Sequence, residues 1–243
     1  MLFNMYIRIY LGLVIGQRKM KNIKEAFKKN YVWIIFAVAL IIFLVILEDV
    51  FEDEIMRCDT ISYNIVINYL RADWLTPIVK VITACGGARV LLTLSLLSLF
   101  FVKRKRIALC ITANLFGITA LNLLLKTIIQ RPRPDGYRLV HENGYSFPSG
   151  HSMVSTAFYG LIIYFIYKNI KNKKLRNVLC ALIGALIFLI GSSRIYLGVH
   201  YASDVIAGFF TSIAYLIIVI KIITIIKTNK KEKAIAKISQ KSF

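Results

Sequence analysis

Long runs of apolar residues, separated by short clusters of lysine and arginine, are the feature that most restricts the fold of this chain. Of its 243 residues, 58% are hydrophobic, and they gather in blocks rather than at the spacing of an amphipathic surface helix. A membrane-spanning helix needs about 20 apolar residues, with a range of about 17–25. Six segments fit or approach this length: 31–47, 83–102, 107–125, 151–167, 175–193 and 204–226. We therefore expect an all-α membrane protein with six transmembrane helices.

Between the first two of these segments, residues 61–82 mix apolar positions with Asn, Arg, Asp and Pro77. This mixture favours an amphipathic helix at the outer membrane surface over a further span. The boundaries of the second and fourth spans are the least well defined. The second span carries Arg89 near one end, and the fourth is at the short limit of the range.

The six-span domain is expected to cover residues 30–227, followed by a basic cytoplasmic tail at 228–243. Residues 1–29 form a cytoplasmic N-terminal segment in this interpretation. Its beginning, 1–19, is apolar but short, has no cleavage-site pattern and precedes Met20. We interpret it as an over-called start, in preference to an interfacial helix or a signal-like segment.

The charge pattern predicts which side of the membrane each loop faces, because Lys and Arg concentrate in cytoplasmic loops. Basic stretches at 18–29, 103–106 and 168–176 and in the tail alternate correctly with six spans, which places both termini in the cytoplasm. The acidic segment that follows the first span then lies outside. The formal charge of +20 could indicate nucleic-acid binding, but the basic residues occur in short clusters between apolar blocks. We expect membrane lipids as partners and no nucleic acid.

Several cations break this pattern, because they lie in or beside loops that should face outward. They are Lys126, Arg131, Arg133 and Arg138 between the third and fourth spans, and Arg194 before the last outer loop. Basic residues are disfavoured in such loops. Their shared ability to hold an oxyanion suggests why they are present.

Three sequence blocks can converge at this outer face. They are Lys126-Thr-Ile-Ile-Gln-Arg-Pro-Arg133-Pro134, Pro148-Ser149-Gly150-His151, and a segment from Ser193-Arg194 through His200 to Asp204. Each block begins or ends an apolar span on the same side of the membrane. A common pocket follows if the six-span topology is correct.

The residue types suggest phosphoryl transfer. Lys126, Arg133 and Arg194 could neutralise a phosphate, and the backbone amides of Ser149 and Gly150 could point at it from a turn that leads into a helix.

His200 and Asp204 are four residues apart, which places them on one face of a helix. The carboxylate would orient the imidazole and leave its other nitrogen free to attack phosphorus. His151 is then available as a general acid for the leaving oxygen. Positioning and charge would drive this reaction without a metal or a cofactor.

The pattern KxxxxxxRP, PSGH and SRxxxxxHxxxD, in this order, resembles the three signatures of the type 2 phosphatidic acid phosphatase superfamily. That superfamily also includes bacterial acid phosphatases and vanadium haloperoxidases. The resemblance is to the branch of bacterial membrane lipid phosphatases. It implies that His200 is the nucleophile, Asp204 its orienting partner and His151 the acid. It also implies a phosphate pocket of Lys126, Arg133, Arg194, Ser149 and Gly150.

The expected function is hydrolysis of a terminal phosphate of a lipid phosphate or pyrophosphate, at the outer face of the cell membrane. Candidate substrates are undecaprenyl pyrophosphate, phosphatidylglycerophosphate and phosphatidic acid, among which the sequence does not choose. The oligomeric state is equally undefined. Alternatives are a lipid phosphotransferase with the same site and a transporter or scaffold that kept the fold. A haloperoxidase is disfavoured because such enzymes are soluble.

The polar residues outside the three blocks are expected to have structural roles. Arg131 and Arg138 are expected at the rim of the pocket, His141 in solvent, and Tyr196 and Tyr201 in the interfacial aromatic belt. Asn114 and Asn122 are expected to make hydrogen bonds between helices. Four scattered cysteines form no CxxC pair and predict neither a disulfide framework nor a zinc site.

Overall fold

The computed structural model describes residues 30–52 and 55–239, with side chains up to residue 229 in the last helix. The chain forms two compact units, Met1–Val38 and Ala39–Phe243, and the boundary falls inside a helix of Asn30–Phe51. The expected over-called start at 1–19 and the rest of the N-terminal segment to residue 29 lie outside the described residues. The tail predicted at 228–243 is described only as backbone from residue 230 to 239.

The remaining elements belong to the second unit, and all of them are helical. They are α2 (Arg57–Ile65), the π-helical turn η1 (Val66–Leu70), α3 (Leu75–Ala84), α4 (Ala88–Phe101), α5 (Lys105–Ile129), α6 (Gly150–Asn169), α7 (Lys173–Tyr196) and α8 (Ala202–Ser239). The described residues contain no strand, which confirms the all-α prediction.

Four of the described helices are individually long and apolar enough to cross a membrane: Asn30–Phe51, α5, α7 and the part of α8 from Ala202 to Asn229. The pair α3 and α4, bent by 45° at a short break, would provide a fifth. α6 has 20 residues but is not among these candidates. The number of six spans therefore remains a prediction, while a multi-pass membrane protein follows from the four or five spans.

The predicted second span, 83–102, has the wrong boundaries. The chain breaks at Cys85–Gly87, so that α4 has only 14 residues and needs α3 to reach a membrane-spanning length. The break allows close packing, since a Cβ at Gly86 would lie 2.4 Å from Ile190 Cγ2 of α7. The expected interfacial segment 61–82 is likewise divided, because its second half forms α3 and belongs to the bent pair.

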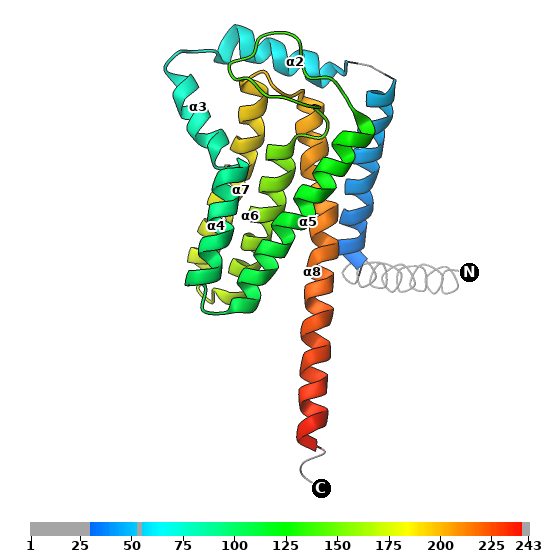
Figure 1. Cartoon of the computed structure of the whole chain (residues 1–243), viewed down its shortest axis with the longest axis vertical. Coiled ribbons are helices and arrows are strands. Elements are labelled where there is room, and N and C mark those ends of the chain that lie inside the picture. The colour runs from blue at the N-terminus through cyan, green and yellow to red at the C-terminus, as the bar shows by residue number, and fades with distance from the viewer. Residues whose placement is uncertain (1–29, 53–54, 240–243) are drawn as a thin grey trace, which may run out of the picture. The chain divides into compact units, whose positions relative to one another are not determined.

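The loops of the second unit lie at two opposite ends (Figure 1). α2 lies across one end, which we call the α2 end, and the α5–α6 and α7–α8 connections lie at this same end. The α4–α5 and α6–α7 turns lie at the opposite end. All three predicted motif blocks are therefore near the α2 end, where they close or open long helices.

α6 packs against α5, α7 and α8, and its buried face combines small residues with large apolar ones. Ser152, Ser155 and Thr156 are buried in it, and a Cβ at Gly208 of α8 would lie 3.1 Å from Ser152 Cβ. Small residues allow helices to approach closely where the solvent is lipid. Asn114 Nδ2 of α5 donates to Ala157 O at 2.9 Å, which confirms the expected bond between helices.

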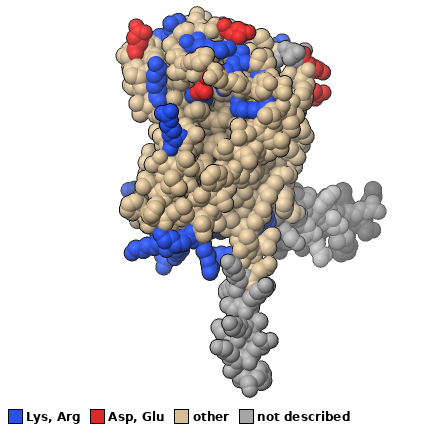
Figure 2. Space-filling model, in the orientation of Figure 1, with Lys and Arg blue, Asp and Glu red and all other residues tan. Residues whose placement is uncertain are grey.

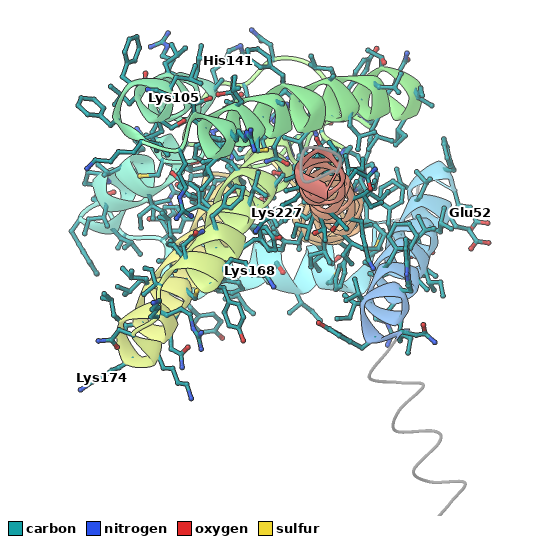
Figure 3. All side chains as sticks on the ribbon, turned by 90° about the horizontal axis from the view of Figure 1, so that it is seen from below. Glu52, Lys105, His141, Lys168, Lys174 and Lys227 are labelled. Carbon is teal, nitrogen blue, oxygen red and sulfur yellow. The ribbon has the colours of Figure 1, made fainter. Side chains whose placement is uncertain are left out.

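Charged side chains are rare in the middle of the face drawn in Figure 2. On the face drawn in Figure 2, acidic side chains gather near the α2 end, basic ones occur toward both ends, and a broad band between them is almost free of charge. Figure 3 labels lysines of the opposite end, namely Lys105, Lys168, Lys174 and Lys227. A band of this kind is what a bilayer requires of the protein surface.

Candidate active site

His200 and Asp204 form the buried centre of the site. His200 lies in the turn between α7 and α8, and its Nδ1 is 3.3 Å from Asp204 Oδ2 in the first turn of α8. Only 4% of His200 and none of Asp204 is exposed. Asp204 Oδ2 also accepts hydrogen bonds from the amide of Tyr201 at 2.9 Å and from the hydroxyl of Ser146. These donors hold the carboxylate against the imidazole.

The other imidazole nitrogen faces a cation. Arg133 Nη1 lies 3.2 Å from His200 Nε2 and also donates to Val199 O at 2.9 Å. A guanidinium can only donate, so Nε2 accepts and the proton of the neutral ring lies on Nδ1, toward Asp204. Burial lowers the pKa of His200 to about 4, while the hydrogen bond to Asp204 acts in the opposite direction. The ring is therefore neutral near pH 7.

The turn that carries His200 depends on Gly198. Its φ of +71° lies in the left-handed region that favours glycine. A Cβ at this position would lie 1.7 Å from Tyr137 O, in the loop between α5 and α6. The same loop is tied to the turn by a hydrogen bond from Leu139 N to Leu197 O of 3.0 Å. Close packing of these two segments thus positions His200.

Lys126 reaches the site from the last turn of α5. Its ammonium group donates to the carbonyl of Tyr145 and, at 3.3 Å, to that of Ser146. These carbonyls belong to the loop that leads into α6. Electrostatic interactions link Lys126 with Arg133, Asp204 and Arg194. The first sequence block thus lies beside the third, as predicted from the topology.

Arg194, in the last turn of α7, is buried to 2% exposure. Its Nη1 donates to Thr83 Oγ1 of α3 at 2.9 Å, and its Nη2 donates to Glu142 Oε1 at 2.5 Å. Burial alone would raise the pKa of Glu142, but the hydrogen bond and charge of Arg194 outweigh it and lower that pKa. Sequence reasoning missed Glu142, since a single acidic residue in an outer loop carries no spacing signal.

The N-terminus of α6 forms another wall. Ser149 is its N-cap, and its hydroxyl accepts from the amide of Ser152 at 3.5 Å and from its hydroxyl at 3.0 Å. The Ser149 amide donates to Asp204 O at 3.0 Å. We find no acceptor among the described residues for the amides of Gly150 and His151. Of the two amides expected to face an anion, that of Ser149 is already engaged, while that of Gly150 is not.

Gly150 also marks a close approach between α5 and α6, because a Cβ there would lie 3.1 Å from Asn122 Oδ1. Asn122 Nδ2 donates to Pro148 O at 3.2 Å and to Met153 Sδ of α6 at 3.3 Å, and the second contact confirms the expected hydrogen bond between helices. His151 Nε2 lies 3.8 Å from the position of a Cβ at Gly87. The imidazole interacts electrostatically with Arg194, Glu142, His200 and Arg133. The predicted acid thus belongs to the same cluster as the predicted nucleophile.

Two predictions outside the motif positions were wrong. Arg131 is not a rim charge: its exposure is 8%, and it forms ion pairs with Asp59 at 3.2 Å and Asp204 at 2.7 Å. Tyr196 is not an exposed aromatic anchor: it is 5% exposed, and its hydroxyl donates to Ala72 O at 3.1 Å. Arg131 is covered by its carboxylate partners on α2 and α8, and Tyr196 is bonded to the segment between η1 and α3.

The other assignments to the loops are closer to the structure. Arg138 is exposed and donates to Pro134 O at 2.7 Å, and His141 is exposed as predicted. Tyr201 is partly buried, with the Arg131 guanidinium 4.2 Å from its ring centroid. In the described part of the chain, no group of three or more His, Cys, Asp or Glu side chains is arranged to hold a metal ion.

Comparison with known proteins adds independent support for the class of the protein. The sequence model of the PAP2 superfamily matches residues 107–227. Phosphatidylglycerophosphatase B of Bacillus subtilis (strain 168) is 37% identical over 147 residues, which cover 58% of this chain and 71% of that protein.

Two solved structures share the fold. A transmembrane PAP2-type phosphatidylglycerolphosphate phosphatase from Bacillus subtilis superposes with a TM-score of 0.69 at 30% identity, covering 77% of this chain and 94% of that one. Aquifex aeolicus LpxE superposes with a TM-score of 0.55 at 27% identity, covering 65% and 92%. The fold and these relatives define a multi-pass membrane phosphatase, a hydrolase. The chain belongs to the PAP2 superfamily.

Proposed function

We propose that this protein removes the terminal phosphate of a lipid phosphate or pyrophosphate through a phosphohistidine intermediate on His200. The observation that carries the proposal is the arrangement of the His200 ring. Its Nδ1 faces Asp204 at 3.3 Å, and its Nε2 faces Arg133 at 3.2 Å. A phosphate held by Arg133 would lie next to the nitrogen lone pair that attacks it.

In the first step, His200 Nε2 forms a bond to phosphorus and the bond from phosphorus to the lipid oxygen breaks. His151 donates a proton to that leaving oxygen. In the second step, water gives a proton to His151 and attacks phosphorus, the N–P bond breaks, and inorganic phosphate leaves. Lys126, Arg133, Arg194 and the α6 N-terminus at Ser149 and Gly150 stabilise the charge on the phosphoryl oxygens. No step needs a metal ion.

We also propose that the site faces the outside of the cell membrane, in a six-span topology with both termini in the cytoplasm. The support is the charge pattern: the lysine-rich turns lie at the end opposite α2 (Figure 3), where cytoplasmic loops are expected. The site residues lie near helix ends rather than at mid-helix. Each ionised group at the bilayer centre would cost at least about 2.5–3.5 kcal/mol.

The purified protein in detergent micelles tests the function. Phosphatidylglycerophosphate, phosphatidic acid and undecaprenyl pyrophosphate should be compared, beginning with the first because a relative is named for it. At least one should release inorganic phosphate, in the presence or absence of EDTA. Thin-layer analysis of radiolabelled phosphate separates hydrolysis from transfer to another acceptor.

His200→Asn should abolish turnover and acid-labile radiolabelling of the protein, because asparagine lacks the imidazole nitrogen that attacks phosphorus. The matched control is His141→Asn, which changes an exposed loop histidine of the same face and should retain full activity. His151→Ala should be slow with a lipid substrate and should recover part of the rate with nitrophenyl phosphate, whose leaving group needs no acid. Activity of His200→Asn at the wild-type level would refute the mechanism.

A further inference from the structure

A buried carboxylate of α2, outside the three motif blocks, contacts the residue that precedes Asp204. Asp59 is 4% exposed. Its Oδ1 accepts from the amide of Ser203 at 2.8 Å, and its Oδ2 accepts from the Ser203 hydroxyl at 2.8 Å. Ser203 directly precedes Asp204, so α2 is attached to the first turn of α8 by side-chain hydrogen bonds. An acidic residue needed only for solubility at the membrane surface would remain exposed.

Arg131 lies between the two carboxylates. Its Nη2 donates to Asp59 Oδ2 at 3.2 Å, and its Nη1 donates to Asp204 Oδ1 at 2.7 Å and to Ser203 Oγ at 2.8 Å. A buried ion costs several kcal/mol of solvation unless it is paired and hydrogen-bonded. Here one guanidinium is shared by two carboxylates. The three side chains together therefore carry one net negative charge.

The two oxygens of Asp204 are thereby divided between two tasks. Oδ1 accepts from Arg131, whereas Oδ2 accepts from the Tyr201 amide and faces His200 Nδ1. Rotation of the carboxylate about the Cβ–Cγ bond would break the hydrogen bonds of both oxygens at once. This division fixes the angle at which Asp204 meets the imidazole.

We propose that Asp59 and Arg131 are positioning residues of the reaction, which hold Asp204 and set the negative charge that it presents to His200. The inference rests on the proposed function of His200 as the nucleophile. It also assigns α2 a place in the active site, beyond that of an interfacial anchor. Neither residue touches the phosphate pocket directly, so both act through Asp204.

The sign of the effect follows from the charges. Without Arg131, the full charge of Asp204 would act on His200, stabilise the imidazolium and raise the pKa of His200. Without the charge of Asp59, Arg131 would offset more of the Asp204 charge, and the pKa of His200 would stay at its wild-type value or fall. The other groups that interact with the ring are the hydroxyl of Ser146 and the charged or titratable side chains of Lys126, Arg133, His151 and Arg194. All of these remain unchanged in both variants.

The test compares Arg131→Met and Asp59→Asn with the wild type in the micelle assay. Arg131→Met should lower kcat by about 10- to 100-fold, the effect of one charge-assisted hydrogen bond, because the lost orientation of Asp204 outweighs its stronger attraction for the imidazolium; KM should change less than about threefold. The acidic limb of the pH profile of kcat for this variant, corrected for ionisation of the substrate phosphate, should move to higher pH. Asp59→Asn should lower kcat less and leave that limb at or below its wild-type position.

Asp135→Asn is the matched control for Asp59→Asn, because it removes the charge of a carboxylate that lies in the same loop as Arg131 and is 99% exposed; it should behave like the wild type. If Arg131→Met does not fold, Arg131→Lys and Ser203→Ala report the same contacts with smaller changes. If every variant yields less active protein but the acidic limb of its pH profile of kcat stays at the wild-type position, the contacts of Asp59 and Arg131 only support the fold, and the inference is wrong. Normal kcat in Arg131→Met would also overturn the inference. A wild-type protein without phosphatase activity would instead refute the proposed function.

Discussion

Replacement of Asp204 by asparagine tests how much the buried carboxylate contributes to catalysis. The substitution keeps the shape of the side chain, but it puts an NH₂ group where one oxygen accepted hydrogen bonds. In the structure Oδ1 accepts from Arg131 at 2.7 Å, and Oδ2 accepts from Tyr201 N at 2.9 Å. Whichever way the amide turns, its NH₂ meets a donor. In either orientation His200 loses the negative charge that favours its proton on Nδ1 and stabilises its imidazolium form.

The size of the effect can be worked from the geometry. The imidazole becomes positively charged as its Nε2 bonds to phosphorus, and its Nδ1 lies 3.3 Å from Asp204 Oδ2. Unit charges at this distance interact by about 5 kcal/mol if the effective dielectric constant is about 20. Arg131 offsets part of this attraction. We expect Asp204→Asn to lose about 4 kcal/mol of transition-state stabilisation, which corresponds to about a thousandfold lower kcat.

The measurement is steady-state phosphate release by purified protein in detergent micelles, with kcat and KM determined separately. KM should change little, because Asp204 does not belong to the proposed phosphate pocket. Asp135→Asn is the control, since its side chain is 99% exposed. A kcat of Asp204→Asn within tenfold of the wild type would refute the role of the carboxylate, as would an equal loss in both variants.

Three further predictions concern pH, the fold and topology. His200 has a pKa of about 4 in the folded protein against 6.5 for the free side chain, so the unfolded chain binds the proton first as the pH falls. Thermal unfolding should therefore show that the wild type loses about 3 kcal/mol of unfolding free energy between pH 7 and pH 4, a loss that His200→Asn does not show. Gly198→Ala should lower the unfolding temperature and the activity, because its Cβ would lie 1.7 Å from a loop carbonyl, whereas Gly184→Ala meets nothing within 4 Å and should do neither. Reporter fusions after residues 105 and 140 should lie on opposite sides of the membrane; the same side for both would contradict the six-span topology.

The helices could largely be predicted from the sequence, because lipid demands long apolar segments with satisfied backbone hydrogen bonds. The second span shows the limit of this reasoning. Hydropathy continues across Gly86 and Gly87, but the backbone bends there to let α7 approach, since a Cβ at Gly86 would lie 2.4 Å from Ile190 Cγ2. The glycine pair was the available signal. Its meaning depends on a neighbour that is remote in the sequence.

The site shows the same division between local and remote information. The spacing of four residues predicted that His200 and Asp204 meet, but the expected shared helix face is wrong for His200, which lies in the turn before α8, while Asp204 belongs to the first turn of that helix. Nothing local connects Asp204 to Asp59, whose contact with Ser203 joins residues 144 positions apart.

The usable clue was Arg131, a cation in a loop where cations are disfavoured, just as for Lys126 and Arg133. All three were grouped as cations able to hold an oxyanion, but Arg131 was expected only at the rim of the pocket, and the anion that it holds is a different one. For Arg131 it belongs to the protein itself: Asp59 and Asp204 already occupy its guanidinium at 3.2 and 2.7 Å. The charge of Arg131 is thus already balanced by carboxylates of the fold, whereas the ammonium group of Lys126 donates to two backbone carbonyls, which carry no net charge and leave its positive charge to be balanced by a phosphate.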